Sequence, residues 1–134
     1  MDEATTATMR ECARASDEER ISFPEVVGRL MQAGIEGYFA DLRRAERIFY
    51  MPDGESLRVA AHRSATAAGA AFRPDGIQAA LRAIQGGEIG YRTFCERILA
   101  AGCVGYIVSL AGRRAVYFGR TAECYTEHFP PPPK

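Results

Sequence analysis

Residues 33–42 read AGIEGYFADL, and residues 101–110, 68 positions further along, read AGCVGYIVSL. The likeness extends without a gap over residues 23–56 and 91–124. The identical pairs are Arg29/Arg97, Ala33/Ala101, Gly34/Gly102, Gly37/Gly105, Tyr38/Tyr106, Leu42/Leu110 and Glu55/Glu123. Because glycine, aromatic and apolar positions recur together in one register, the sequence indicates an internal duplication.

Each copy begins with helix signals. In SFPEVVGRLMQAG, residues 22–34, Ser22 and Glu25 have the spacing of a capping box, which is typical of a helix N-terminus. The second copy of this helix is YRTFCERILAAG, residues 91–102. Gly34 and Gly102 are expected to end the two helices.

A further helix is predicted before each of these. In the second copy it begins at Asp75, with Gln78 in the capping-box position, and places Ile77, Leu81 and Ile84 on one face. In the first copy the matching helix is expected over residues 4–15.

Strands follow the helices, because the apolar period changes to two after Ile35. ERIFY and AVYF predict a second strand in each copy, and a third is expected after the turns PDGE and GRTAE. Each unit therefore reads α-α-β-β-β. The predicted fold class is α+β, with four helices and two three-stranded antiparallel sheets or one joined sheet.

The expected organisation is a single domain over residues 1–134, built of two repeats. Its parts are a first repeat at 4–59, an alanine-rich linker at 60–72, a second repeat at 73–129 and a disordered proline-rich tail at 130–134.

Composition excludes several classes of function. Seventeen basic residues balance seventeen acidic ones, so no electrostatic attraction to nucleic acid is expected. The polar start MDEATTATMRE and the absence of a long apolar run predict a cytoplasmic protein without a membrane segment.

The cysteines, Cys12, Cys95, Cys103 and Cys124, have neither C-x-x-C nor zinc-site spacing. No metal or cofactor is therefore predicted.

Repeated glycines and carboxylates allow two interpretations each. Gly37 and Gly105 are interpreted as sites of close backbone approach, with ligand space against the sheet as the alternative. Glu55 and Glu123 could act together in acid–base chemistry if the fold brought them close, and a salt bridge to a nearby arginine is the simpler interpretation.

The two faces of the predicted strands both carry apolar residues. One face is expected to hold Tyr38, Leu42, Ile48, Tyr50, Tyr106, Leu110, Val116 and Phe118 beneath the helices. The opposite face is expected to hold Phe39, Phe49, Ile107 and Tyr117, together with Asp41, Arg47 and Ser109. Aromatics on a second face indicate a core between the two repeats, a dimer interface or a ligand groove.

Several phrases resemble the YdfO/YbcV-like family of small uncharacterised bacterial and prophage-borne proteins, sometimes labelled phage envelope protein. They include FPEVVGRLMQAGIEGYFADL, YMPDGESL, GEIGYRTF, AAGCVGYIVSLAGRRAVYFGR and EHFP, and the resemblance as a whole covers roughly residues 5–130. The resemblance implies an α+β domain and brings no activity, cofactor or catalytic residue with it.

The sequence thus favours a non-enzymatic binding or protein-interaction module, in the form of a homodimer whose partner surface is the second sheet face. The alternative is a small-molecule-binding protein or enzyme with a pocket between the two repeats. Tyr38, Tyr106, Glu55 and Glu123 are expected to line that pocket.

Overall fold

The computed structural model describes residues 1–130; the part of the predicted tail at 131–134 lies outside the described residues. Its elements follow one another in the order α1 (Glu3–Asp17), α2 (Phe23–Gln32), β1 (Gly37–Asp41), β2 (Glu46–Tyr50), β3 (Ser56–Ala60), α3 (Pro74–Gln85), α4 (Tyr91–Ala100), β4 (Cys103–Ser109), β5 (Arg114–Gly119) and β6 (Cys124–His128). The chain is therefore α+β, with the order α-α-β-β-β occurring twice.

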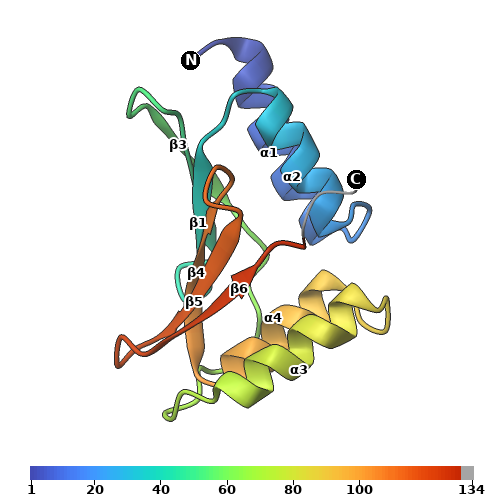
Figure 1. The fold of residues 1–134 in the computed structure, drawn as a ribbon, viewed down its shortest axis with the longest axis vertical. Coiled ribbons are helices and arrows are strands. Elements are labelled where there is room, and N and C mark those ends of the chain that lie inside the picture. The colour runs from blue at the N-terminus through green and yellow to red at the C-terminus, as the bar shows by residue number, and fades with distance from the viewer. Residues whose placement is uncertain (131–134) are drawn as a thin grey trace.

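All six strands form one antiparallel sheet, in the order β3-β2-β1-β4-β5-β6. The two halves of the chain meet at its centre, where β1 pairs with β4 and Phe39 lies opposite Ile107. Of the two sheet arrangements left open by the sequence, the joined sheet is the one formed. Figure 1 shows all four helices on one side of this sheet, as a pair α1–α2 and a pair α3–α4.

Local signals explain where most helices begin. The Asp2 carboxylate accepts a hydrogen bond from the backbone N–H of Thr5 at the start of α1, and Ser22 and Glu25 form the predicted capping box of α2. Helix α3 begins at Pro74 with no side-chain cap, so the capping box predicted from Asp75 is wrong. Proline at the first helical position supplies the start signal instead.

Helix α4 receives its cap from elsewhere in the chain. Its N-cap residue is Gly90, which has no side chain to offer. The Glu19 carboxylate, just beyond α1, accepts a hydrogen bond from the backbone N–H of Arg92 at 3.1 Å. This contact joins the end of α1 to the start of α4 and thereby connects the two helix pairs.

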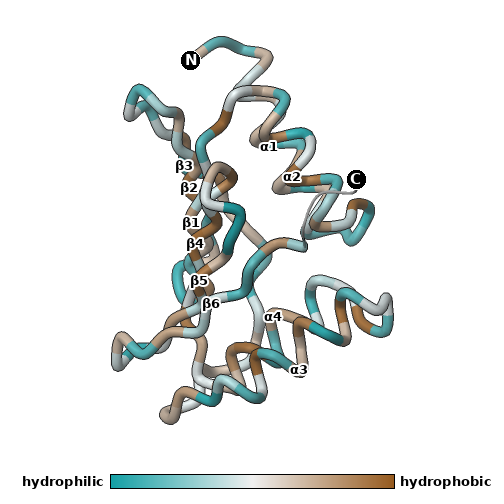
Figure 2. The backbone as a smooth tube through the Cα atoms, in the orientation of Figure 1, coloured by the Kyte–Doolittle hydropathy of each residue, from teal (hydrophilic) through white to brown (hydrophobic). Residues whose placement is uncertain are grey.

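The main core lies between the sheet and the helices, and Figure 2 shows the apolar residues of the central strands and of the helix faces. Its largest fully buried side chains are those of Phe49, Met9, Leu30, Ile77, Ile98, Val104 and Val108. Since every helix and the four central strands contribute to it, the two halves of the chain share one core.

The predicted faces of the second strands are wrong by one residue. Asp41 pairs with Glu46, which places Tyr38 opposite Phe49 rather than between Ile48 and Tyr50. The same holds for β4 and β5, where Tyr106 lies opposite Tyr117. A shift of one residue exchanges the two faces of a strand.

The turns cause this shift. Four residues connect β1 to β2 and four connect β4 to β5, and the last residue of each turn, Ala45 or Arg113, has a positive φ. Phe49, Tyr117 and Arg47 therefore lie beneath the helices, with 1%, 5% and 3% of their surfaces exposed. Ile48, Tyr50, Val116 and Phe118 lie on the opposite face.

The four repeated glycines occupy two kinds of position. Gly34 and Gly102 follow the ends of α2 and α4 with φ of +76° and +90°, a conformation that L side chains rarely adopt. Gly37 and Gly105 lie in the paired strands β1 and β4. A Cβ at Gly105 would meet the carbonyl oxygen of Ala40 at 2.8 Å, and one at Gly37 would meet that of Val108 even more closely. Close strand approach therefore accounts for both.

Candidate functional site

The residues chosen from the sequence as pocket-lining do not assemble into a pocket. Tyr38 and Tyr106 lie side by side in the core, with ring centroids 6.2 Å apart. Glu55 and Glu123 lie in the β2–β3 and β5–β6 turns, at opposite corners of the sheet. The Glu55 carboxylate pairs with the amino group of Met1 at 2.5 Å, and the Glu123 carboxylate accepts a hydrogen bond from the Thr121 hydroxyl.

A charged group lies beneath the helices, where sequence reasoning had not placed one. The Arg47 guanidinium, on β2, donates to the Asp17 carboxylate at 2.8 Å and lies 5.2 Å from the centre of the Tyr91 ring. Burial opposes the positive charge, but Tyr91 and the Asp17 carboxylate raise the pKa of Arg47 well above its usual value. A buried charge of this kind is tolerated because it is paired.

Tyrosine hydroxyls surround this ion pair. The hydroxyls of Tyr91 and Tyr106 share a hydrogen bond of 2.7 Å. Burial raises the pKa of Tyr38 to about 12 and also raises the pKa values of Tyr91, Tyr106 and Tyr117 well above the usual value. These phenols remain neutral at physiological pH, and each is packed against other side chains, so the cluster is structural.

Asp17 also fixes the segment that follows β3. Its second carboxylate oxygen accepts a hydrogen bond from the backbone N–H of His62 at 3.1 Å. Its backbone carbonyl accepts one from Nε of Arg92 at 2.8 Å. Asp17 therefore connects the end of α1 to β2, to the segment after β3 and to α4.

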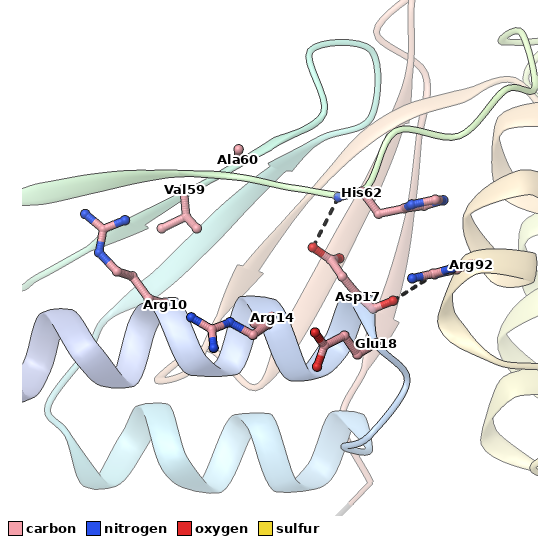
Figure 3. Close-up of a pocket in the computed structure, with 8 residues that line it drawn as sticks. All are labelled: Arg10, Arg14, Asp17, Glu18, Val59, Ala60, His62 and Arg92. Carbon is pink, nitrogen blue, oxygen red and sulfur yellow. Dashed lines mark hydrogen bonds between the residues drawn. The ribbon is translucent and has the colours of Figure 1, made fainter.

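These connections form one wall of a polar pocket of about 450 Å³. Figure 3 shows Arg10 and Arg14 on α1, Val59 and Ala60 above them, and Arg92 reaching in from α4. The remaining lining residues are Asp17, Glu18 and His62. Sequence reasoning missed this pocket because arginines spaced four apart on a helix also fit an ordinary solvated face.

The other side of the sheet carries an apolar band that no helix or strand of residues 1–130 covers (Figure 1). It runs diagonally across the four central strands and consists of Tyr50, Ile48, Phe39, Ile107, Val116 and Phe118. Ile107 is 49% exposed and Tyr50 is 39% exposed. The rings of Phe39 and Phe118 stack at 5.7 Å, so the band forms one continuous surface.

Polar residues surround this band. Glu46 is held by the guanidinium groups of Arg44 and Arg58, at 2.7 Å and 3.2 Å. Asp41 accepts hydrogen bonds from two backbone N–H groups of its own turn. An apolar centre with a polar rim is the usual anatomy of a protein–protein interface.

Within the described residues there is no group of histidine, cysteine or acidic side chains that could hold a metal ion. Cys12, Cys95 and Cys103 are buried and Cys124 is exposed. Among the helices of residues 1–130, none has the length and apolar character needed to cross a membrane.

The fold defines a small α+β protein whose single antiparallel sheet is covered by helices on one face only. Residues 18–128 match a family model described as a protein of unknown function, DUF1398. Because that match covers most of the chain, the protein belongs to this family.

Similar curated proteins come from mycobacteria. A protein of Mycobacterium bovis and two from strains of Mycobacterium tuberculosis, each named an uncharacterised protein, are 37% identical over 59 residues. The match covers 44% of this chain and 36% of each relative, so it spans about a third of the length of those proteins.

Proposed function

We propose that this protein is a non-enzymatic interaction module that forms a homodimer through the apolar band. The observation that carries the proposal is the exposure of Ile107 and Tyr50 at the centre and one end of a band flanked by polar residues. Antiparallel sheets that face water on one side normally present polar residues there. A contiguous apolar surface on such a face is typical of an interaction site.

A second copy of the chain is the partner that fits this surface best. The band is centred on the pair Phe39 and Ile107, which are also equivalent positions in the two copies of the repeated sequence. A twofold dimer uses the same patch on both subunits. A patch arranged evenly about its own centre can therefore pack against the same patch of a second copy, and each copy then covers the apolar surface of the other.

Charge supports the same partner. Asp41 and Arg114 flank the band on opposite sides, and neither forms an ion pair with another side chain in residues 1–130. Strands lie about 4.8 Å apart and alternate residues about 6.8 Å apart along a strand. The diagonal band therefore extends roughly as far across the strands as along them. A twofold axis along the band would set Asp41 of each copy near Arg114 of the other.

Internal duplication is part of the proposal, and backbone conformation supports it. Within residues 1–130, eight residues have a positive φ, and they fall into four pairs at the repeat spacing, namely Glu19/Gly87, Gly34/Gly102, Ala45/Arg113 and Gly54/Ala122. Three of these pairs differ in residue type, so glycine content alone does not produce the agreement. We also propose that the protein is related to YdfO/YbcV-like proteins and that it is located in the cytoplasm.

Size-exclusion chromatography with light scattering tests the dimer directly. The native chain is expected at twice its monomer mass of 14.7 kDa, with dissociation on dilution. Arg114→Glu, which places a carboxylate near Asp41 of the partner, is expected to weaken the dimer while leaving the monomer folded. A monomeric native chain at several hundred micromolar would overturn the proposal.

A further inference from the structure

The pocket between α1, β3 and α4 holds more positive than negative charge. Arg10 and Arg14 lie on α1 and make no ion pair with a carboxylate in residues 1–130. The two acidic residues of the lining are already engaged, because Asp17 pairs with Arg47 and Glu18 pairs with Arg20 at 2.6 Å. The pocket therefore carries guanidinium groups without counter-charges.

Arg92 adds a third guanidinium and is held in place. Its Nε donates to the carbonyl of Asp17 at 2.8 Å, and no hydrogen bond within residues 1–130 engages its terminal nitrogens. The backbone N–H of the same residue is fixed by Glu19. Arg92 is thus anchored through its backbone N–H and its Nε, and its outer N–H groups are free to bind a ligand.

The segment carrying His62 closes the other side of the pocket. Its backbone N–H is bound to Asp17, and Arg63 donates to the carbonyl of Arg43 at 3.0 Å. These contacts hold the segment against the end of α1. The imidazole of His62 is exposed and lines the pocket on the same side as Arg92 (Figure 3).

We infer that this pocket binds a small phosphorylated molecule, with Arg10 and Arg14 on α1 as ligands of its phosphoryl group and Arg92, at the opposite end of the pocket, as the ligand of a second acidic or polar group of the same molecule (Figure 3). Guanidinium groups form paired, charge-assisted hydrogen bonds with phosphate oxygens. The volume of about 450 Å³ exceeds the need of a bare phosphate and falls within the range of small-molecule sites. Val59 and Ala60 provide an apolar wall for the organic part of the ligand.

The site is independent of the proposed dimer. It lies between α1 and the helix-covered side of β3, whereas the apolar band lies on the opposite face of the sheet. Binding and dimerisation can therefore be tested separately, and the failure of one leaves the other standing.

Isothermal titration calorimetry of the full chain with inorganic pyrophosphate tests the inference, with citrate as a tricarboxylate comparison. The expected result is saturable binding of one pyrophosphate per chain, at least tenfold tighter than that of citrate. The double variant Arg10→Gln/Arg14→Gln is expected to bind at least about tenfold more weakly, since hydrogen bonds to charged groups contribute strongly to affinity.

Arg97→Gln provides the matched control, because Arg97 is an exposed helical arginine outside the pocket. It is expected to leave pyrophosphate affinity unchanged. Three outcomes would overturn the inference: no binding at millimolar pyrophosphate, tighter binding of citrate, or equal losses in the double variant and in Arg97→Gln. Thermal unfolding of each variant without ligand identifies any loss that comes from misfolding, and Arg14→Lys, which keeps the charge, then provides the second test.

Discussion

Phe39 of β1 lies directly opposite Ile107 of β4, and the two residues are 68 positions apart, the same spacing that separates the repeated phrases. Residues that correspond in sequence are therefore neighbours at the centre of the sheet. This relationship makes the uncovered face continuous across both halves of the chain, and it places the most exposed apolar side chain of the band, Ile107, at the middle of that face.

The buried ion pair gives the first prediction. Replacing Arg47 with methionine removes the partner of Asp17 and leaves a carboxylate in a site where its side chain is 17% exposed. We expect a loss of about 3 kcal/mol in the free energy of unfolding, measured by urea denaturation. Adding Asp17→Asn should recover part of this loss, because the uncompensated charge is then gone. A change below about 0.5 kcal/mol in Arg47→Met would contradict the structure of this site.

Alkaline pH gives the second prediction. Burial raises the pKa of Tyr38 from its usual value of 10.0 to about 12, and the pKa values of Tyr91, Tyr106 and Tyr117 also rise. The unfolded chain therefore releases phenolic protons at a lower pH than the folded chain. Stability should be fully present below about pH 10 and should fall as pH rises toward 12.

Near-ultraviolet absorbance measured together with circular dichroism checks this expectation. The four buried phenols should ionise only as the protein unfolds. Their ionisation in a protein that keeps its native circular dichroism would be inconsistent with the buried cluster.

Thiol reactivity gives the third prediction. Cys124 is exposed, whereas burial raises the pKa of Cys12 above its usual value and raises those of Cys95 and Cys103 to about 11. A disulfide reagent at neutral pH should modify one thiol per native chain rapidly and the other three only after denaturant is added. Cys124→Ser should abolish the rapid phase. Rapid reaction of a second thiol in the native protein would show that the core is more open than described.

Turn conformation gives the fourth prediction. Ala122 has φ of 67°, and the corresponding position in the first half is Gly54, with φ of 94°. Ala122→Gly should raise the free energy of unfolding by about 0.5 to 1 kcal/mol, because glycine adopts this conformation without steric cost. Gly54→Ala should lower it, although a Cβ there would meet no other atom within 4 Å. Equal effects of the same sign would contradict the equivalence of the two turns.

Much of the fold could be predicted from sequence, because its signals are local. The Ser22–Glu25 capping box and the glycines that end α2 and α4 act within a few residues, and the repeated phrases placed the same elements in each half. The faces of β2 and β5 could not be predicted in the same way. They depend on the length of a turn and on a positive φ at Ala45 and Arg113, for which neither residue type gives a signal.

The candidate sites were harder to predict because they depend on contacts between distant residues. Arg47 has the sequence context of a solvent-facing strand residue, and its partner Asp17 is 30 positions away. Arg10 and Arg92 come from different halves of the chain. The apolar character of the second face was predicted, but two of its three aromatic members, Phe49 and Tyr117, belong instead to the core.

The most direct test of the central claim is sedimentation equilibrium of the native chain and two matched lysine variants. Ile107→Lys changes a residue that is 49% exposed at the centre of the band, and Met31→Lys changes one that is 50% exposed on α2, in the helix layer. We predict a dimer for the native chain and for Met31→Lys, and a folded monomer for Ile107→Lys with association weakened at least about thirtyfold. A native monomer, or unchanged association in Ile107→Lys, would contradict the account.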